Sequence, residues 1–150
     1  MSDEIVFFDP PRLPSAEADA PAVERSIARL AASGVNGWEG LRDCYTPDFE
    51  FESRRTSFPR RGGIEDWLPL MKTSTEFFPE GDMRLVARRG DRLALVKATS
   101  RDPASGFEHT MLAINETTPD ALTHRVTFFD NHQYDEAVQL LESYDVSDVT

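Results

Sequence analysis

The spacing of apolar residues changes along the chain, from a helical period near the N-terminus to strict alternation in the second half. A first helix is expected between Asp19, which caps its N-terminus ahead of Pro21, and Gly34, which ends it. Its apolar stripe consists of Val23, Ile27, Leu30 and Ala31. A short second helix follows Asn36 and ends before Pro47.

A half-buried strand and a third helix are predicted in the middle of the chain. Residues 49–53 alternate between apolar and polar, as in a strand with one buried face. An arginine-rich loop through Gly62 and Gly63 leads to the helix, and Pro69 inside its pattern predicts a late start or a kink. The apolar side of this helix consists of Ile64, Trp67, Leu68 and Met71, with Phe78 beyond them.

The second half of the chain predicts a meander of four strands followed by a last helix. Hairpin turns are expected at Gly90-Asp91 and around Pro119. The strands cover residues 83–89, 92–100, 107–116 and 122–130, and the helix covers residues 134–144. This order indicates an α+β domain in which an antiparallel sheet carries its helices on one face.

Residues 1–14 are expected to form an N-terminal arm, and residues 15–150 a single domain. In the arm, Pro10 and Pro11 stop a short apolar run, because a proline pair favours extended backbone and blocks a helix. With 39% hydrophobic residues and ten phenylalanines, a chain of 150 residues can bury one substantial core. A disordered, collagen-like or coiled-coil chain is excluded.

Composition and charge restrict where the protein is expected to act and which partners it is expected to bind. No apolar run is long enough to span a bilayer and the acidic first residues are not a secretory signal, so we expect a cytoplasmic protein. The net charge of −11 argues against nucleic acid and anionic membranes as partners. Residues 54–101 carry eleven bases and six acids, and this basic segment either docks on acidic segments or forms a solvated face. The single Cys44 excludes an internal disulfide.

The last two strands predict one mostly apolar face. If Glu116 pairs with Ala121, odd positions on one strand lie beside even positions on the other. The first face then holds Phe107, His109, Met111, Ala113, Leu122, His124, Val126, Phe128 and Asp130. The opposite face includes Leu112, Ile114 and Phe129, and we expect it to be exposed or to form a subunit contact.

His109 and Asp130 are the strongest candidates for chemistry. On this register His109 lies opposite Phe128 and diagonal to Asp130, so an imidazole and a carboxylate converge at one end of an apolar pocket. Such a pair can move a proton during catalysis. In the alternative interpretation, Asp130 caps the last helix and His109 is a satisfied core residue.

The remaining candidates have weaker signals. The side chains that could line a pocket for a small hydrophobic ligand, or simply form the core, are Tyr45, Trp38, Trp67, Met111, His124 and Phe128. The arginines beside Gly62 and Gly63 either bind an anionic ligand or belong to a solvated loop. The histidines lack metal-ligand spacing and no nucleotide-binding or hydrolase motif occurs, so we expect no metal and no cofactor.

Three segments of the chain carry a resemblance to a known family: residues 38–51, 62–68 and 125–130. They follow the order helix, first strand, a helix start of the type G-x-E-x-W, and a last strand that ends in Asp. From about residue 19 to residue 144, the chain resembles the nuclear transport factor 2-like superfamily, in its SnoaL-like polyketide cyclase branch. The resemblance implies a cone-shaped, curved antiparallel sheet wrapped on N-terminal helices, with a central pocket and a short C-terminal helix.

The resemblance also implies site residues and a function. The acid/base Asp of SnoaL-like cyclases corresponds to Asp130, with His109 on the neighbouring strand, whereas the base of ketosteroid isomerase corresponds to Ser53. The first hypothesis is therefore a cofactor-free cyclase or isomerase that uses acid/base catalysis on a hydrophobic, carbonyl-containing, polyketide-like substrate. The alternatives are a non-catalytic small-molecule-binding domain and a dimerisation domain of the same fold. Many relatives pair through the outer face of the sheet, so we expect a homodimer.

Overall fold

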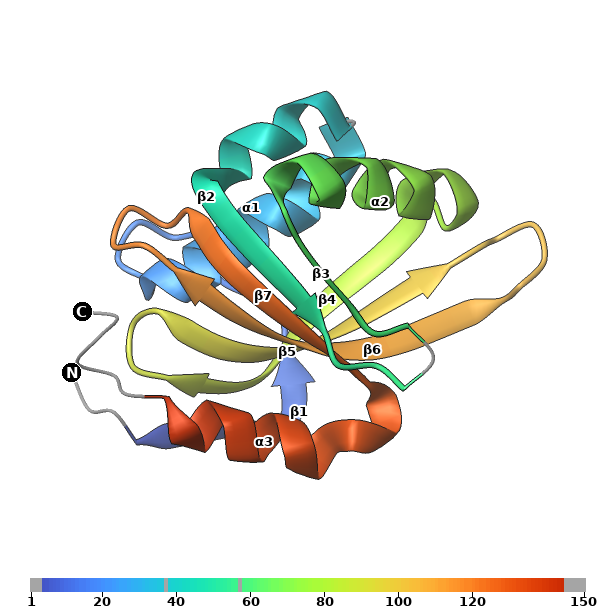
Figure 1. Cartoon of the computed structure of the whole chain (residues 1–150). Helices are drawn as coiled ribbons and strands as arrows, with labels where there is room; N and C mark the ends of the chain where they lie inside the picture. Colours follow the sequence, from blue (N-terminus) through green and yellow to red (C-terminus); the bar gives the residue numbers. More distant parts are fainter. Residues whose placement is uncertain (1–3, 37, 57, 145–150) are drawn as a thin grey trace.

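A computed structural model of the chain describes residues 4–36, 38–56 and 58–144, with the backbone alone for residues 33–36, 38 and 39 (Figure 1). Its strands form one curved sheet in the order β1-β4-β5-β6-β7-β2-β3. The strands are β1 (Ile5–Arg12), β2 (Tyr45–Ser53), β3 (Arg60–Gly63), β4 (Glu80–Arg89), β5 (Leu93–Arg101), β6 (Glu108–Thr117) and β7 (Thr123–Asp130). The helices are α1 (Ala22–Asn36), η1 (Trp38–Cys44), α2 (Ile64–Phe77), η2 (Asn131–Gln133) and α3 (Tyr134–Ser143).

The sheet contains the predicted meander, but its two edges differ from the prediction. Strands β4 to β7 pair antiparallel, as the alternation predicted. Strand β2 lies parallel to β7, so the sheet is mixed and the expectation of an antiparallel sheet is wrong at this pair. Strand β3 pairs with β2 where a loop was expected. At the other edge β1 pairs with β4, so most of the expected arm belongs to the sheet.

The β6–β7 hairpin has the predicted faces with a different register. Glu116 pairs with Arg125 rather than with Ala121. The change in register is an even number of residues, and side chains alternate with period two, so the two face assignments are unchanged. Asp130 pairs with Met111 and lies diagonal to His109 on the same face.

Helices cover both faces of the sheet, whereas the sequence analysis placed them on one. Helices α1 and α2 lie on the face that we call inner, and α3 lies on the outer face (Figure 1). Leu112, Ile114 and Phe129 are at most 2% exposed, because they pack with Ala137 and Leu141 of α3. The expectation that they form an exposed subunit contact is wrong, and the homodimer stays a prediction with no surface assigned to it.

The N-terminus of α1 is capped from a distant turn. Helix α1 begins at Ala22, whose amide donates to Oδ1 of Asp91 at 3.0 Å, so the expectation that Asp19 supplies the cap is wrong. Asp91 follows Gly90, which adopts φ of 65° in the predicted β4–β5 turn. Pro69 lies inside α2, but that helix begins at Ile64 without the delay that the proline predicted.

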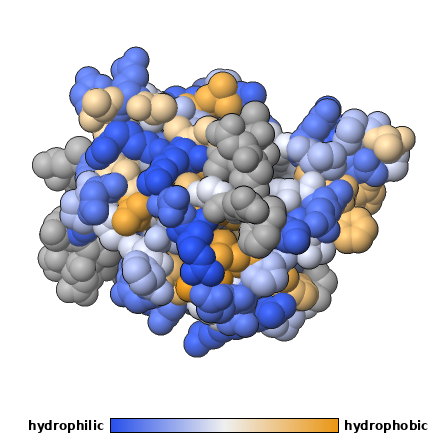
Figure 2. Space-filling view, turned by 90° about the horizontal axis from the view of Figure 1, so that it is seen from above, coloured by the Kyte–Doolittle hydropathy of each residue, from blue (hydrophilic) through white to orange (hydrophobic). Residues whose placement is uncertain are grey.

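Polar and charged side chains cover most of the inner-face helices on their solvent side. Figure 2 shows this side with small apolar patches between hydrophilic ones. In the part of the chain that the structure describes, no helix has both the length and the apolar character needed to cross a membrane.

Candidate functional site

An aromatic cluster fills the inner face between α2 and β7. The ring of Trp67 stacks on Phe128 with the centroids 5.1 Å apart, and it packs against Phe49 and Phe51 at 5.5 and 5.1 Å. Tyr45 meets Trp67 edge-on at 6.2 Å, and burial raises the pKa of its phenol. All five side chains are buried. The predicted lining residues Tyr45, Trp67 and Phe128 are thus brought together, and their rings fill this part of the face.

Ser53 places a polar atom at the edge of this cluster. It pairs with Phe128 across the β2–β7 ladder and is 6% exposed. Its hydroxyl oxygen is buried and has no hydrogen-bond partner among the described residues. A buried hydroxyl without a hydrogen bond lowers the stability of the fold by about 1–3 kcal/mol, and a water molecule or a ligand commonly supplies the missing hydrogen bond.

Asp130 lies at the end of β7, where it binds the loop that follows β2. Its Oδ1 accepts a hydrogen bond from Nε of Arg55 at 2.9 Å, and its Oδ2 accepts bonds from the amide and the hydroxyl of Thr56, both at 2.9 Å. The bond from Arg55 is the main reason that the pKa of Asp130 falls to about 2. The carboxylate is therefore charged at neutral pH, and both of its oxygens are engaged.

The same residue also stabilises the start of the C-terminal helices. Asp130 occupies the N-cap position of η2, and its amide donates to Oε1 of Gln133 at 2.7 Å. Nε2 of Gln133 in turn donates to the carbonyl oxygen of Arg54 at 3.1 Å. One residue thus joins the loop after β2 to the end of β7.

His109 is half-buried on the inner face, at the beginning of β6. Its ring centroid lies 6.4 Å from that of Phe78, which lies 5.8 Å from that of the exposed Phe107. Burial lowers the pKa of His109, and the charge of Arg55 lowers it further, while Asp130 acts in the opposite direction. The imidazole is therefore neutral at pH 7 and can accept a proton.

The other predicted residues are dispersed. Met111 is half-buried on the same face. His124 lies at the opposite end of β7, with its Nδ1 3.4 Å from the hydroxyl of Thr46 and 3.6 Å from the carboxylate of Asp48. The side chain of Trp38 lies outside the described part of the chain.

The sequence analysis missed Arg55 and Thr56 as the partners of Asp130. The only signal for them was the arginine-rich loop, which was considered for an anionic ligand. Within the chain, Arg55 binds Asp130, while Arg54 and Arg61 bind Glu52 at 3.2 and 2.8 Å. No local pattern connects Arg55 with a carboxylate 75 residues further along the chain.

An open groove of about 970 Å³ lies beside β2, β3 and the end of α3, and Phe49 and Phe51 of the aromatic cluster line part of it. The charges along it pair with one another, as in Glu52 with Arg61 and Arg125 with Glu50 at 3.2 Å. Among the residues described, those that line the groove include none of the predicted site residues. Nor do the described residues contain a group of three or more His, Cys, Asp or Glu side chains that could hold a metal ion.

Comparison with known proteins identifies the fold. No family model matches the sequence, and no curated protein matches it. A de novo designed protein with a curved β-sheet is similar in structure, with a TM-score of 0.60 and 16% identity over 80% of this chain and 93% of the other. A loop-truncation variant of IdmH has a TM-score of 0.57 and 21% identity over 77% and 97% of the two chains.

A natural isomerase has the same architecture. The steroid delta-isomerase from Pseudomonas aeruginosa has a TM-score of 0.55 and 16% identity over 84% of this chain and 90% of its own. At such low identity these similarities show the fold alone, a curved sheet packed against helices, which agrees with the fold that the sequence resemblance implied. Enzymes and designed proteins share this fold, so function has to be argued from the side chains.

Proposed function

We propose that this protein binds a small apolar molecule with a carbonyl group where β6 begins and α2 ends, and that it moves a proton on that molecule without a cofactor. The observation that carries the proposal is the half-buried imidazole of His109, whose pKa is lowered by burial and by the charge of Arg55. The ring of Phe78 lies 6.4 Å from it, and the exposed ring of Phe107 lies 5.8 Å from Phe78. The steroid delta-isomerase among the structural neighbours supports the proposal, because it is an isomerase with the same fold.

His109 is the proton acceptor in this proposal. Its nitrogen lone pair removes a proton from the carbon next to the carbonyl, and the C–H electron pair moves toward the carbonyl carbon to form an enolate. When a carbon–carbon double bond adjoins the deprotonated carbon, the intermediate is a dienolate, and the imidazolium returns the proton to the far end of that double bond. The double bond shifts by one position, which gives an isomer with no net change in composition. An imidazole with a lowered pKa is neutral before the reaction and can act as this base.

Arg55 stabilises the enolate oxygen. Arg55 binds Asp130 through Nε, so the N–H groups of its two terminal nitrogens can donate hydrogen bonds to the enolate oxygen, where negative charge develops. Asp130 is a positioning residue for this guanidinium, because a carboxylate with a pKa of about 2 is a weak base. This assignment differs from the sequence hypothesis, in which Asp130 moved the proton and His109 assisted it.

Apolar side chains supply the rest of the binding surface. Phe78, Phe107 and Met111 lie near His109 and can hold a flat ring against the sheet. We place the ligand at this end of the inner face, since the rings of Trp67 and Phe128 fill the space further in. Binding without turnover would use the same surface and would not require the imidazole.

The test uses 2-tetralone, a cyclic aromatic ketone, as the probe. Proton NMR in deuterated buffer follows the exchange of the protons next to its carbonyl, and chemical-shift changes in the protein follow binding. We expect the protein to accelerate the exchange, His109→Gln to remove the acceleration and Arg55→Met to reduce it strongly.

His124→Gln is the matched control, because this histidine lies at the other end of β7. It should leave the acceleration unchanged. Binding of 2-tetralone without any acceleration would favour the non-catalytic alternative, and the absence of binding would overturn the proposal.

A further inference from the structure

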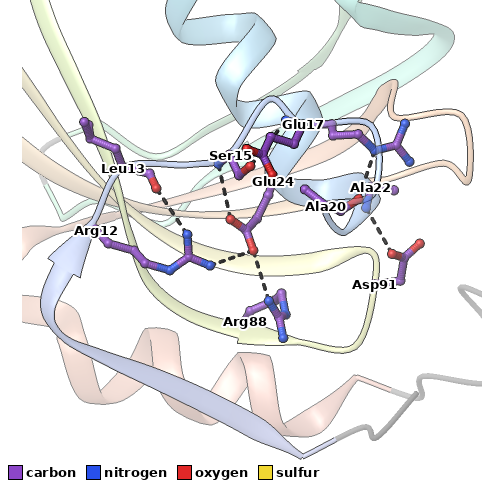
Figure 3. Close-up of polar contacts among 10 residues, drawn as sticks. Arg12, Leu13, Ser15, Glu17, Ala20, Ala22, Glu24, Arg88 and Asp91 are labelled. Atoms are coloured by element: carbon purple, nitrogen blue, oxygen red, sulfur yellow. Dashed lines mark hydrogen bonds and ion pairs between the residues drawn. The ribbon is translucent and has the colours of Figure 1, made fainter.

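The turn between β4 and β5 holds elements on both faces of the sheet. We call residues 88–92 the cap turn. Arg88 binds Glu24 of α1, and Asp91 caps the amide of Ala22 at the start of the same helix (Figure 3). Arg89, between them, binds the end of α3. Because neighbouring strand residues point to opposite faces, Arg88 and Arg89 reach opposite sides of the sheet.

On the inner side, the cap turn meets a buried carboxylate. The side chain of Glu24 is only 2% exposed, and its Oε2 accepts bonds from Arg88 at 3.0 Å and from Arg12 at 2.8 Å. Its Oε1 accepts a bond from the amide of Ser15 at 3.3 Å (Figure 3). We call residues 12–20 the N-terminal strap. Glu24 therefore ties this strap to α1 and to the cap turn.

On the outer side, one arginine closes the end of α3. Nη1 of Arg89 donates to the carbonyl oxygens of Leu141, Glu142 and Tyr144 at 2.8, 2.8 and 2.9 Å. The last carbonyls of a helix lack partners within the helix and carry partial negative charge, so a guanidinium there is favourable. Helix α3 has ten residues, and isolated helices shorter than about 12–15 residues are marginal in water. Its docking therefore depends on such contacts.

We propose that the cap turn couples two attachments. One is the docking of α3 on the outer face, and the other is the attachment of the N-terminal strap and the first turn of α1 on the inner face. The three coupling side chains lie within four residues of one backbone turn, which the pairing of Arg89 with Leu93 closes. When α3 separates from the sheet, Arg89 loses its carbonyl partners and the turn loses an anchor. Arg88 and Asp91 then hold Glu24 and Ala22 less firmly.

The coupling has a consequence for the inner face. Leu30 of α1 packs against the aromatic cluster that contains Trp67 and Phe128. A molecule that binds or displaces α3 on the outer face would thus change the support of a helix that packs on the inner-face cluster. This inference does not depend on the ligand or the reaction proposed above.

Amide hydrogen exchange of the full chain, read by mass spectrometry, tests the coupling. Leu141→Ala loosens α3 without changing the cap turn. We expect exchange to become about fivefold faster or more in α3 and also in residues 12–30, relative to the central amides of β6. In an Arg89→Met background, which already lacks the link, adding Leu141→Ala should accelerate α3 and leave residues 12–30 unchanged.

Leu68→Ala is the control, because it loosens α2 at a comparably buried leucine. It should accelerate α2 and leave the N-terminal strap unchanged. Val138→Ala provides a milder change in α3 if the Leu141 variant unfolds. Acceleration confined to α3 in the Leu141 or Val138 variant would overturn the proposal.

Discussion

Glu24 and Asp130 are both carboxylates bound by arginines, and they differ in what surrounds them. Glu24 is 2% exposed, and its partners are two arginines and the amide of Ser15 in the N-terminal strap. Asp130 is 14% exposed and binds one arginine and one threonine. The half-buried imidazole of His109 lies diagonal to Asp130 on the same face, whereas the partners of Glu24 belong to the N-terminal strap and the cap turn.

The difference separates an ion pair that stabilises the fold from one that, in the proposed function, positions a guanidinium next to the ligand. At Glu24, the two guanidinium groups and the strap amide converge on one buried charge, so the interaction stabilises the N-terminal part of the domain. At Asp130, the guanidinium of Arg55 is fixed through one nitrogen and lies close enough to His109 to lower its pKa. The second arrangement leaves groups that can act on a ligand.

The largest effect is expected at Glu24. Glu24→Gln replaces a buried carboxylate by a neutral amide and removes the negative partner of Arg88 and Arg12, whose side chains are partly exposed, which should lower the free energy of unfolding by about 3 kcal/mol. Urea denaturation at pH 7 measures this change. Glu52→Gln is the control, since Glu52 also binds two arginines but at the surface, and its loss should cost about 1 kcal/mol or less. Equal effects of the two substitutions would show that the burial of Glu24 does not matter.

A smaller effect is expected at Asp130, and it should depend on pH. Asp130→Asn weakens charge-assisted bonds to Arg55 and Thr56, which should lower the free energy of unfolding by about 2 kcal/mol at pH 7. The folded pKa of about 2 lies below the usual 3.8, so this contribution is present above pH 4 and disappears as the pH falls from 4 toward 2.

Denaturation of both proteins across this pH range measures the effect. The difference in stability between the wild type and Asp130→Asn should shrink as the pH falls through the window. A difference that stays constant from pH 7 to pH 2 would contradict the depressed pKa.

The smallest effect on stability is expected at the exposed ring near His109. Phe107 is 59% exposed, so Phe107→Ala should change the free energy of unfolding by less than about 0.5 kcal/mol. Loss of an aromatic contact of about 1 kcal/mol should weaken 2-tetralone binding about fivefold, as measured by NMR titration. Phe7→Ala, at an exposed phenylalanine of β1 at the other edge of the sheet, is the control and should leave the affinity unchanged. Equal affinities for the wild type and Phe107→Ala would place the ligand elsewhere.

Much of the fold could be predicted from local patterns. The four strands of the meander and the last helix lie within a few residues of their predicted positions, since alternation and helical spacing reflect which side of each element is buried. The inner face of the β6–β7 hairpin was assigned correctly even though Glu116 pairs with Arg125. The register differs from the predicted one by an even number of residues, so each side chain stays on its predicted face. His109 and Asp130 were therefore placed on one face from the sequence alone.

The sequence by itself determined the four strands of the meander, the positions of the helices and which hairpin residues share a face, but not that residues 5–12 and 60–63 become edge strands. Only the tertiary structure decided that β2 lies parallel to β7, that α3 covers Leu112 and Phe129, and that Arg55 binds Asp130. It also decided that Asp91 caps a helix 69 residues earlier. The physical reason is that hydrophobic periodicity acts between near neighbours, whereas caps, ion pairs and edge strands depend on which distant segments the folded sheet brings within hydrogen-bond distance.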